Sequence, residues 1–502
     1  MPFLRKAELQ PVKGINLAIP STYLPDGNNY PQNMQYLRGE MKKRDGKSVI
    51  GGVSLGAQKI LHLGTFETTS GNNRLIRHTK TNIQKYNTAQ KRWDDITGAD
   101  LTGSETDFTS SGVVTESDLY LSTNYINNIR KYADTGVTAN LGGSPPKAKF
   151  IEYVTPYVLL AYVDTFPSKV AWCDTGQPEV WAGGNAGSVL LSDDSTYIRG
   201  MKKLRDYVFV YKEGSIYKGN KVATSDVFDF GGPFSTGKGL YSGRAIASDG
   251  ENHYYMGLND FHINNGVRII DIGGPIREYL FNRLNRERNN TCHAIHMEYY
   301  KEVWFFVTVA GSDWPEEVWK YNYETGFWYF DTVANCTASI NYKQSTSLTW
   351  DDLIGTWDQQ IIHWDDQQGS TDAPIQVFGF DTGFTARLDS SLVNDMGQAV
   401  DARLDTKDFT GLTHNGIEFD SRFLQFDVWA SGDTVKLSYS LDYGANWIFV
   451  GEKALGSSIE RVIFYFDVIA KRIRFRLQAE SLASRLIIRG FTPYYLAGTE
   501  HP

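Results

Sequence analysis

Residues 298–330 limit the possible fold more than any other part of the chain. The run at 303–309 (VWFFVTV) is rich in β-branched and aromatic residues and ends at a loop of Gly, Ser, Asp and Pro, which predicts a buried strand. Two further apolar runs, 318–321 and 327–330, flank a turn that contains Gly326. This order predicts an antiparallel meander. A meander of a few strands exposes two apolar faces, so it must pack against similar units.

Related meanders recur along most of the chain. They occupy residues 60–93, 119–132, 150–181, 201–230, 244–272 and 353–380, a spacing of roughly 40 to 60 residues that is typical of propeller blades. An aromatic content of 14% and 47 glycines also favour strands and turns. We therefore predict an all-β fold with a β-propeller of about seven blades in residues 51–388, with six or eight blades left open.

The first 50 residues do not repeat this pattern. Prolines at 20, 25 and 31 remove backbone donors and favour an extended chain, so residues 1–50 are predicted to form an extended, Pro-rich N-terminal arm. The end of the arm is basic, and two interpretations stay open for it: a solvated turn, or a contact with a partner or a phosphate. The candidate contact residues are Arg38, Lys42, Lys43 and Arg44.

Residues 389–502 consist of alternating apolar and polar positions. In residues 472–477 (RIRFRL) the arginines fall on one face of a strand and the apolar residues on the other, which is typical of a half-exposed sheet. We predict a separate C-terminal β-sandwich here.

One turn of this sandwich fits the pattern S-x-D-x-G-x-x-W. It consists of Ser440, Asp442, Gly444 and Trp447 and resembles the Asp-box of sialidases. In a hairpin turn, the aspartate accepts backbone N–H groups, the glycine supplies a positive φ and the tryptophan packs the turn onto the sheet. We interpret the motif as structural and not as a sign of sialidase chemistry.

Three other patterns were weighed as sites. A G-x-S-x-G motif contains Ser54, but a strand and not a helix is expected after it, which argues against a nucleophile elbow. His293 and His296 fall on opposite faces of an expected strand, which argues against a metal pair. Residues 349–366 combine three tryptophans with several aspartates, a composition that leaves glycoside hydrolysis open as an alternative. We predict no catalytic residue, no metal site and no cofactor.

Charge and cysteine content narrow the functional classes. A formal net charge of −8 gives no indication of a general nucleic-acid or membrane-surface binder. Three widely spaced cysteines, Cys173, Cys292 and Cys336, fit reduced structural thiols better than a disulfide framework. The N-terminal residues contain no apolar core of a signal peptide, and we expect folding in a cytoplasm.

Several short motifs resemble those of tail hub or nozzle proteins of short-tailed, podovirus-type bacteriophages, the family that includes packaged-DNA stabilisation proteins. They lie at residues 14–17 (GINL), 24–27 (LPDG), 33–34 and 43–46 (KRDG), where Asp45 replaces a proline of the family. Residues 349–357 (TWDDLIGTW), 439–444 and 472–475 resemble the late blade and the final sandwich of the same proteins.

The resemblance implies a non-enzymatic structural virion protein. Its relatives form rings, usually hexamers, that join the head-to-tail connector to the distal tail and form part of the DNA ejection channel. The implied partners are copies of the chain, portal and adaptor proteins, and tail fibre, spike or needle proteins, with transient contact to genomic DNA in the lumen. The implied location is the virion tail, after assembly in the host cytoplasm. A carbohydrate- or receptor-binding propeller and a propeller glycosidase remain the alternatives.

Overall fold

The computed structural model describes residues 5–6, 14–24, 29–37, 39–222, 227–343, 374–410, 412–414 and 417–497. Strands dominate these residues, and the helices among them are short. The helices are η1 (Ser21–Tyr23), η2 (Leu55–Ala57), η3 (Thr115–Ser117), α1 (Arg277–Phe281) and η4 (Arg286–Thr291). None of the described helices is long and apolar enough to cross a membrane. The prediction of an all-β fold is confirmed.

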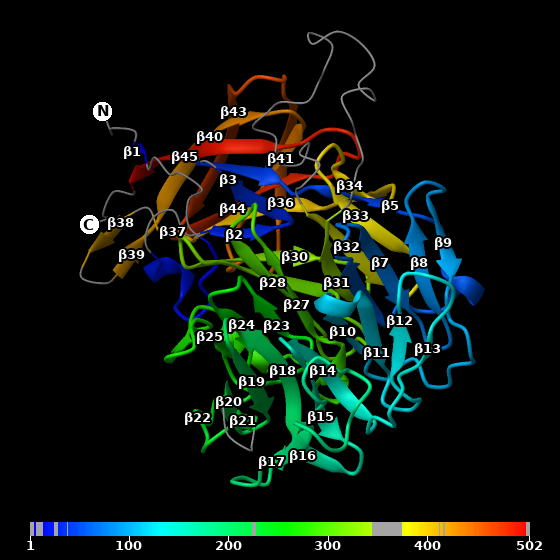
Figure 1. The fold of residues 1–502 in the computed structure, drawn as a ribbon. Helices are drawn as coiled ribbons and strands as arrows, with labels where there is room; N and C mark the ends of the chain where they lie inside the picture. The colour runs from blue at the N-terminus through cyan, green and yellow to red at the C-terminus, as the bar shows by residue number, and fades with distance from the viewer. Residues whose placement is uncertain are drawn as a thin grey trace.

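Within the described residues, seven small antiparallel sheets form the blades of a β-propeller (Figure 1). From the inner to the outer edge, the first blade consists of β6 (His62–Glu67), β7 (Asn73–His78), β8 (Ile83–Asn87) and β9 (Arg92–Asp95). The second blade consists of β10 (Ser110–Val114), β11 (Leu119–Thr123), β12 (Arg130–Tyr132) and β13 (Ala139–Asn140). The third blade consists of β14 (Ala148–Val154), β15 (Tyr157–Val163), β16 (Phe166–Trp172) and β17 (Gly187–Leu190). The fourth blade consists of β18 (Ile198–Leu204), β19 (Tyr207–Lys212), β20 (Ser215–Lys221) and β21 (Phe228–Asp229), with β22 (Ser235–Thr236) also on β20. The fifth blade consists of β23 (Ile246–Ser248), β24 (His253–Met256), β25 (Phe261–Asn264) and β26 (Ile269–Asp271). The sixth blade consists of β27 (His293–Met297), β28 (Glu302–Val307), β29 (Glu317–Asn322) and β30 (Phe327–Thr332).

The seventh blade joins the two ends of the propeller. Its strands are β31 (Cys336–Tyr342), β32 (Ile375–Phe380), β33 (Thr385–Asp389) and, from the N-terminal region, β5 (Gly46–Val49), with β34 (Asn394–Asp395) and β35 (Gln398–Ala399) beyond it. β5 pairs antiparallel with β33, and β31 lies against β6 of the first blade. The ring is therefore closed by a strand that comes from the segment expected to be an arm.

The stacking of the blades explains why β28 reads as a continuous apolar run. All residues of this strand are buried. Val303, Phe305 and Val307 pack in a cluster with residues of the fifth blade, whereas Trp304 and Phe306 pack with residues of the seventh blade. Each face of a blade is covered by its neighbour, so both sets of alternating side chains must be apolar. The meander predicted for residues 298–330 is confirmed in its strands and turns.

The C-terminal region contains two facing sheets. One consists of β3 (Met34–Leu37), β4 (Glu40–Lys43), β45 (Ile487–Ala497), β40 (Ser421–Ser431) and β43 (Glu460–Ala470), with β1 (Arg5–Lys6) on β45. The other consists of β2 (Asn29–Gln32), β36 (Ala402–Thr406), β44 (Arg472–Ala479), β41 (Thr434–Ser440) and β42 (Ile448–Ala454), with β37 (Phe409–Thr410) on β44. A separate hairpin is formed by β38 (Leu412–His414) and β39 (Ile417–Phe419). Phe426, Ile473 and Phe475 are among the fully buried residues of the core between the sheets.

The segment expected to be an arm, residues 1–50, is built into these sheets at residues 5–6 and again in the strands that begin at residue 29. In Figure 1 the blue strands β2, β3 and β5 lie among the yellow, orange and red strands of the chain's C-terminal part. β2 pairs with β30 of the sixth blade on one side and with β36 on the other, so one sheet runs from the propeller into the sandwich. The expectation of an arm is therefore wrong for residues 29–37 and 39–49, because their backbone groups pair within the chain.

A second expectation needs correction at the seventh blade. Its first part was expected at residues 353–362, which lie outside the described residues. The inner strand is instead β31, whose sequence CTASINY has no continuous apolar run. The strand predicted at residues 376–380 is confirmed as β32.

Candidate functional site

The basic cluster predicted as a partner or phosphate contact is mostly buried. Arg38 lies outside the described residues. Lys43 and Arg44 are 0% and 5% exposed, and only Lys42 lies near the surface, 3.8 Å from Glu40. The Lys43 ammonium donates to the carbonyl of Ser481. The expectation of an external contact is wrong for Lys43 and Arg44, because both side chains bind groups of the same chain.

Arg44 is the centre of an ionic network at the junction of propeller and sandwich. Its Nη1 and Nη2 atoms donate to the two carboxylate oxygens of Asp395 at 2.9 and 2.6 Å. The Lys47 ammonium lies 3.1 Å from both of these oxygens. Although burial raises the pKa of Asp395, the charges of Lys47 and Arg44 and their hydrogen bonds lower it further, well below its usual range. The carboxylate therefore stays ionised inside the protein.

The network continues into the sixth blade. Lys320 of β29 lies 2.9 Å from Asp331 of β30, and the Nε of Arg44 lies 3.8 Å from the same carboxylate. Asp45 accepts hydrogen bonds from the Tyr300 hydroxyl and pairs with Arg485 at 2.7 Å. Blade, sandwich and the segment between β4 and β5 are thus held by the same set of charges. Such a network is strongly destabilised when one partner is removed.

The Asp-box-like turn has the predicted geometry. The Ser440 hydroxyl donates to Asp442 at 2.8 Å, and Asp442 accepts the backbone N–H of Asn446 at 2.9 Å. Gly444 has a φ of +92°, the left-handed region that the turn requires. The Arg476 guanidinium lies 3.9 Å from the ring centre of Trp447, which fixes the turn on the sheet. The motif forms a turn that is held by hydrogen bonds within a few residues.

The side chains of the two other described motifs are bound by groups of the same chain. Ser54 is buried, and its hydroxyl donates to the carbonyl of Gln58. His293 stacks on Phe306 with a ring distance of 4.4 Å, whereas His296 contacts the Tyr323 hydroxyl at 3.2 Å. No group of His, Cys, Asp or Glu among the described residues is arranged to hold a metal ion. The Trp- and Asp-rich segment 349–366 lies outside the described residues.

The central channel of the propeller holds a cavity of about 410 Å³ lined by the inner strands of all seven blades. Glu152 is the only carboxylate among the described residues that line it. Burial raises the pKa of Glu152, and the charge of Lys202 opposes this shift. Arg244, whose pKa burial lowers to about 10, donates to the backbone carbonyls of Leu61, Thr337 and Asn290. Arg244 therefore joins the first and seventh blades to η4.

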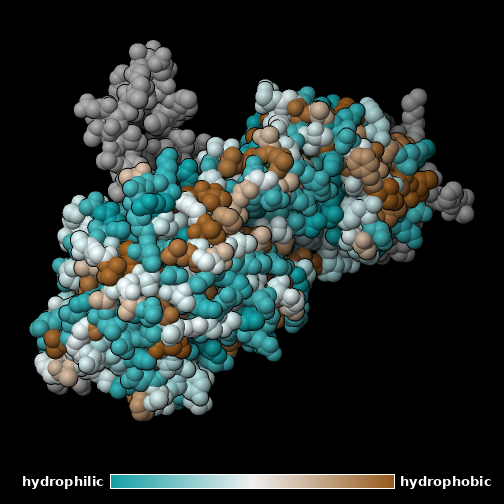
Figure 2. Space-filling model, turned by 90° about the vertical axis from the view of Figure 1, so that its right-hand side faces the viewer, coloured by the Kyte–Doolittle hydropathy of each residue, from teal (hydrophilic) through white to brown (hydrophobic). Residues whose placement is uncertain are grey.

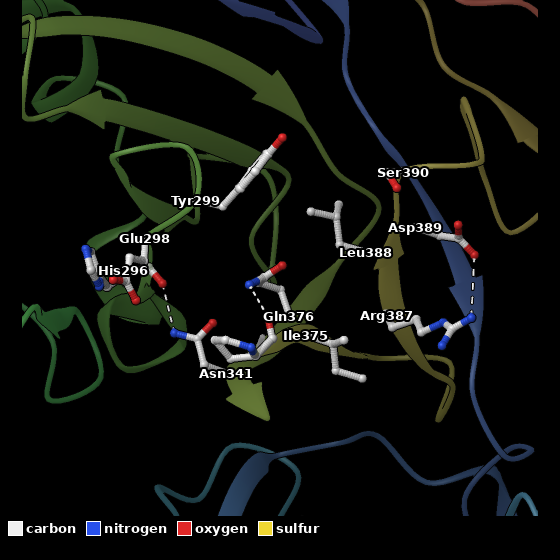
Figure 3. A pocket seen from close by; sticks show the side chains of 11 residues that line it. His296, Glu298, Tyr299, Asn341, Ile375, Gln376, Arg387, Leu388, Asp389 and Ser390 are labelled. Carbon is white, nitrogen blue, oxygen red and sulfur yellow. Dashed lines mark hydrogen bonds and ion pairs between the residues drawn. The ribbon is translucent and has the colours of Figure 1, made fainter. Parts of the chain in front are cut away.

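A smaller cavity of about 220 Å³ lies between the sixth and seventh blades (Figure 3). Most of its polar side chains already have partners within the chain. Asn341 donates to the carbonyl of His296 at 2.8 Å, and Gln376 donates to the carbonyl of Pro374 at 2.9 Å. Arg387 lies 3.9 Å from Asp389 and donates to the Ser48 hydroxyl at 3.2 Å. The arrangement stabilises the closure of the ring and leaves few groups for a ligand.

The acidic partners of the basic cluster were missed from the sequence. Asp331 and Asp395 lie hundreds of positions from Arg44, so no local pattern links them. One signal was present: Lys320 interrupts the apolar run VWKY of a strand that is buried on both faces. A buried lysine requires a carboxylate nearby, so its position predicts an internal ion pair.

The comparisons with known proteins concern the fold. No protein-family model matches the sequence, and no curated protein matches it. Among solved structures, the WD40 domain of Neurospora crassa Pan2 is 8% identical with a TM-score of 0.42, and the match covers 68% of this chain and 95% of that chain. PorZ of Porphyromonas gingivalis, an essential bacterial surface component of the type-IX secretion system, is 9% identical with a TM-score of 0.37, and the match covers 68% of this chain and 38% of that chain. TM-scores below 0.5 carry no argument about function.

Proposed function

We propose that this chain is a non-enzymatic structural subunit of a bacteriophage tail, of the hub or nozzle kind, that assembles with copies of itself into a ring. One observation carries the proposal most: the propeller and the sandwich share a continuous sheet and a buried ionic network. A propeller and a sandwich joined in this way form one rigid unit. A rigid unit suits a subunit that transmits force to neighbouring subunits of an assembly. The resemblance of short sequence motifs to those of tail hub proteins supports this choice of assembly.

The central channel of the propeller supports a specific version of this proposal. A cavity of about 410 Å³ is too small for a DNA double helix, because a cylinder as wide as the major groove alone, about 12 Å, would fill this volume within about one base-pair rise of roughly 3.4 Å. DNA would therefore pass through the centre of the ring of subunits and not through each propeller. The formal net charge of −8 favours such a path, because an acidic wall does not retain the phosphate backbone.

A non-enzymatic role is supported by the lining of the channel. A glycosidase needs two carboxyl groups held roughly 5 to 9.5 Å apart across the bond that is cleaved. Among the described residues that line the channel, Glu152 provides one carboxyl group and has no acidic neighbour. The channel thus lacks, in its described part, the pair that this chemistry uses.

The sandwich offers a surface for lateral contacts. β42 and β43 are the edge strands of its two sheets, and they expose Phe449 and Tyr465 by 58% and 72%. Ile448 and Ile469 are also exposed on these strands. Figure 2 shows, on one face of the molecule, separate hydrophobic patches within a largely hydrophilic surface. Exposed apolar residues on edge strands are typical of contacts between chains.

Native mass spectrometry and negative-stain electron microscopy of the purified full chain test the proposal. We expect a closed ring, hexameric by analogy with the family, with a central hole. A Phe449→Asp, Tyr465→Asp variant should lower the ring population at a given concentration, whereas Val267→Asp, at a residue that is 79% exposed on the propeller, should not. A chain that stays monomeric up to high micromolar concentration, or that hydrolyses glycans, would contradict the proposal.

A further inference from the structure

A cavity of about 330 Å³ lies at the end of the propeller where the inner strands β14 and β18 begin. It adjoins the central channel, with which it shares Phe108, Phe150 and Gly243. Its remaining wall comes from loops of several blades and from η4. A volume of this size is at the lower end of the range for small-molecule sites.

Lys149 is the central cation of this cavity. Its ammonium group lies 4.1 Å from the ring centre of Tyr162 and 5.4 Å from that of Tyr125, and the two rings meet edge to face. In the described part of the chain, the ammonium group has no carboxylate partner and no hydrogen-bond acceptor, and its contacts are the two tyrosine rings. Burial lowers the pKa of Lys149, and the positive charge of Arg199 lowers it further. The cavity thus holds a partly buried cation without a counter-ion, an unfavourable arrangement unless a ligand supplies the anion.

Both tyrosines that flank Lys149 have strained backbones. Tyr125 has a φ of +64° and Tyr162 a φ of +59°, a region that bulky residues seldom adopt. The Tyr125 hydroxyl donates to the carbonyl of Asp164, and Tyr162 lies at an irregularity in the pairing of β15 with β16. Strain of this kind is retained mainly where a side chain must be held in a particular place. Here it directs both rings toward the same ammonium group.

Arg199 adds a second, partly neutralised cation. Its Nη2 donates to Glu213 at 2.9 Å, whereas its Nε–H is buried and has no acceptor among the described residues. Asp107 is the only carboxylate in the described lining, and it accepts hydrogen bonds from the backbone and the hydroxyl of Ser104. Arg199 is thus paired with Glu213, and Lys149 is the cation of the described lining that has no carboxylate partner and can face one negative charge.

We propose that this cavity binds an acidic saccharide, with the carboxylate of a sugar ring placed against Lys149 and Arg199. The ring of Tyr197, 52% exposed at the rim, offers an apolar surface for the C–H face of a sugar. The amide side chain of Asn289 lines the same cavity and suits a sugar hydroxyl group, whereas the Asn124 amide is already bonded to Thr102, Ile126 and Asn127. This inference does not depend on the ring assembly proposed above.

A nucleic acid fits the site less well. Proteins that bind single strands use a positively charged groove that follows the successive phosphates. Here the two cations line one cavity of about 330 Å³, and the chain as a whole is acidic. Arg199 is also paired with Glu213, which reduces the positive charge available to a ligand. The remaining charge suits a monoanion better than a polyanion.

Isothermal titration calorimetry with the full chain tests the inference. The probes are trigalacturonate with its methyl ester, and sialyllactose with lactose, so that each acidic saccharide has a neutral counterpart. We expect millimolar or tighter binding of at least one acid and at least about tenfold weaker binding of its neutral counterpart. A single-stranded oligonucleotide is the third probe and should bind more weakly than the acid.

The variant Lys149→Met keeps the apolar stem and removes the charge. We expect at least about tenfold weaker binding of the acid, with an unchanged or higher melting temperature, because the wild-type cation is partly buried without a counter-ion. The matched control Lys471→Met, at an exposed lysine of the sandwich, should bind as the wild type does. The inference is overturned if acid and neutral sugar bind alike, if neither acid binds at millimolar concentration, if the oligonucleotide binds more tightly, or if Lys149→Met retains full affinity.

Discussion

The two partners of the buried pair between Arg44 and Asp395 should respond unequally to mutation. The substitution Asp395→Asn keeps the shape of the side chain and removes its charge. It leaves Arg44 and Lys47, whose side chains are 6% and 5% exposed, without the carboxylate that both of them bind. The next nearest carboxylate to Arg44 is Asp331 at 3.8 Å, and that group is already bound to Lys320 at 2.9 Å.

The expected cost follows from this geometry. An uncompensated buried charge costs about 3 to 5 kcal/mol, so Asp395→Asn should lower the free energy of unfolding by about that amount. Arg44→Met leaves Asp395 bound to Lys47 at 3.1 Å through both oxygens, so the remaining carboxylate is still paired. This variant should lose about 2 kcal/mol, from the missing charge-assisted hydrogen bonds.

Urea denaturation followed by tryptophan fluorescence and by circular dichroism measures both variants. The matched control is Asp467→Asn, which breaks the exposed pair of Asp467 with Arg422 and should leave the midpoint unchanged. The reasoning is refuted if Arg44→Met is as destabilising as Asp395→Asn, or if Asp395→Asn changes the free energy of unfolding by less than about 1 kcal/mol.

Three further predictions concern other parts of the fold. Gly46→Ala should destabilise the chain by about 1 to 3 kcal/mol, because an added Cβ would lie 2.2 Å from the carbonyl oxygen of Asn394. Urea denaturation midpoints check this prediction. The control is Gly52→Ala, where an added Cβ meets no atom, and not Gly39→Ala, because Gly39 has a φ of +86°. The buried thiols should not react with Ellman's reagent at pH 8 in the folded protein, because burial raises the pKa of Cys292 to about 11 and that of Cys336 to about 12. In denaturant all of them should react. Rapid labelling of the native chain would contradict this prediction. Burial lowers the pKa of His78 to about 3, below the unfolded value of about 6.5, so the stability that the neutral ring contributes is present above pH 6.5 and is lost as the pH falls toward 3. The wild type should therefore lose stability between pH 7.5 and 5, and His78→Phe should remove up to about 2 kcal/mol of that loss. An unchanged dependence of the unfolding free energy on pH in this variant would contradict the prediction.

Local patterns were sufficient to predict the central strands of the blades. The strands around Val303, Val318 and Phe327 follow from apolar runs separated by turn residues, because every central blade strand is covered on both faces. The turn at Ser440 and Asp442 follows in the same way from hydrogen bonds within a few residues. These features depend on neighbours in the sequence, and a single sequence contains that information.

The closure of the ring and the junction could not be predicted in this way. β5 pairs with β33 from more than three hundred positions away, and Arg44 binds Asp395 across a separation of 351 residues. The sequence of a basic run such as Lys42, Lys43 and Arg44 is the same whether the run lies on a surface or in a buried ionic network. Only the acidic partners, which are distant in the sequence, distinguish the two cases. The same reason applies to the saccharide pocket, whose cations Lys149 and Arg199 come from different blades.

The region between β2 and β5 links the stability of both halves of the molecule. β2 to β4 complete the two sheets of the sandwich, and β5 completes the seventh blade. Loss of this segment would expose β33 of the propeller and β36 of the sandwich at the same time. The two halves should therefore unfold in one transition even though each has its own hydrophobic core. A destabilising change at Gly46, which lies in the propeller, should consequently shift the unfolding of the sandwich tryptophans, Trp429 and Trp447, as much as that of the propeller tryptophans. Two separate transitions in the wild type would show that the shared strands do not couple the halves.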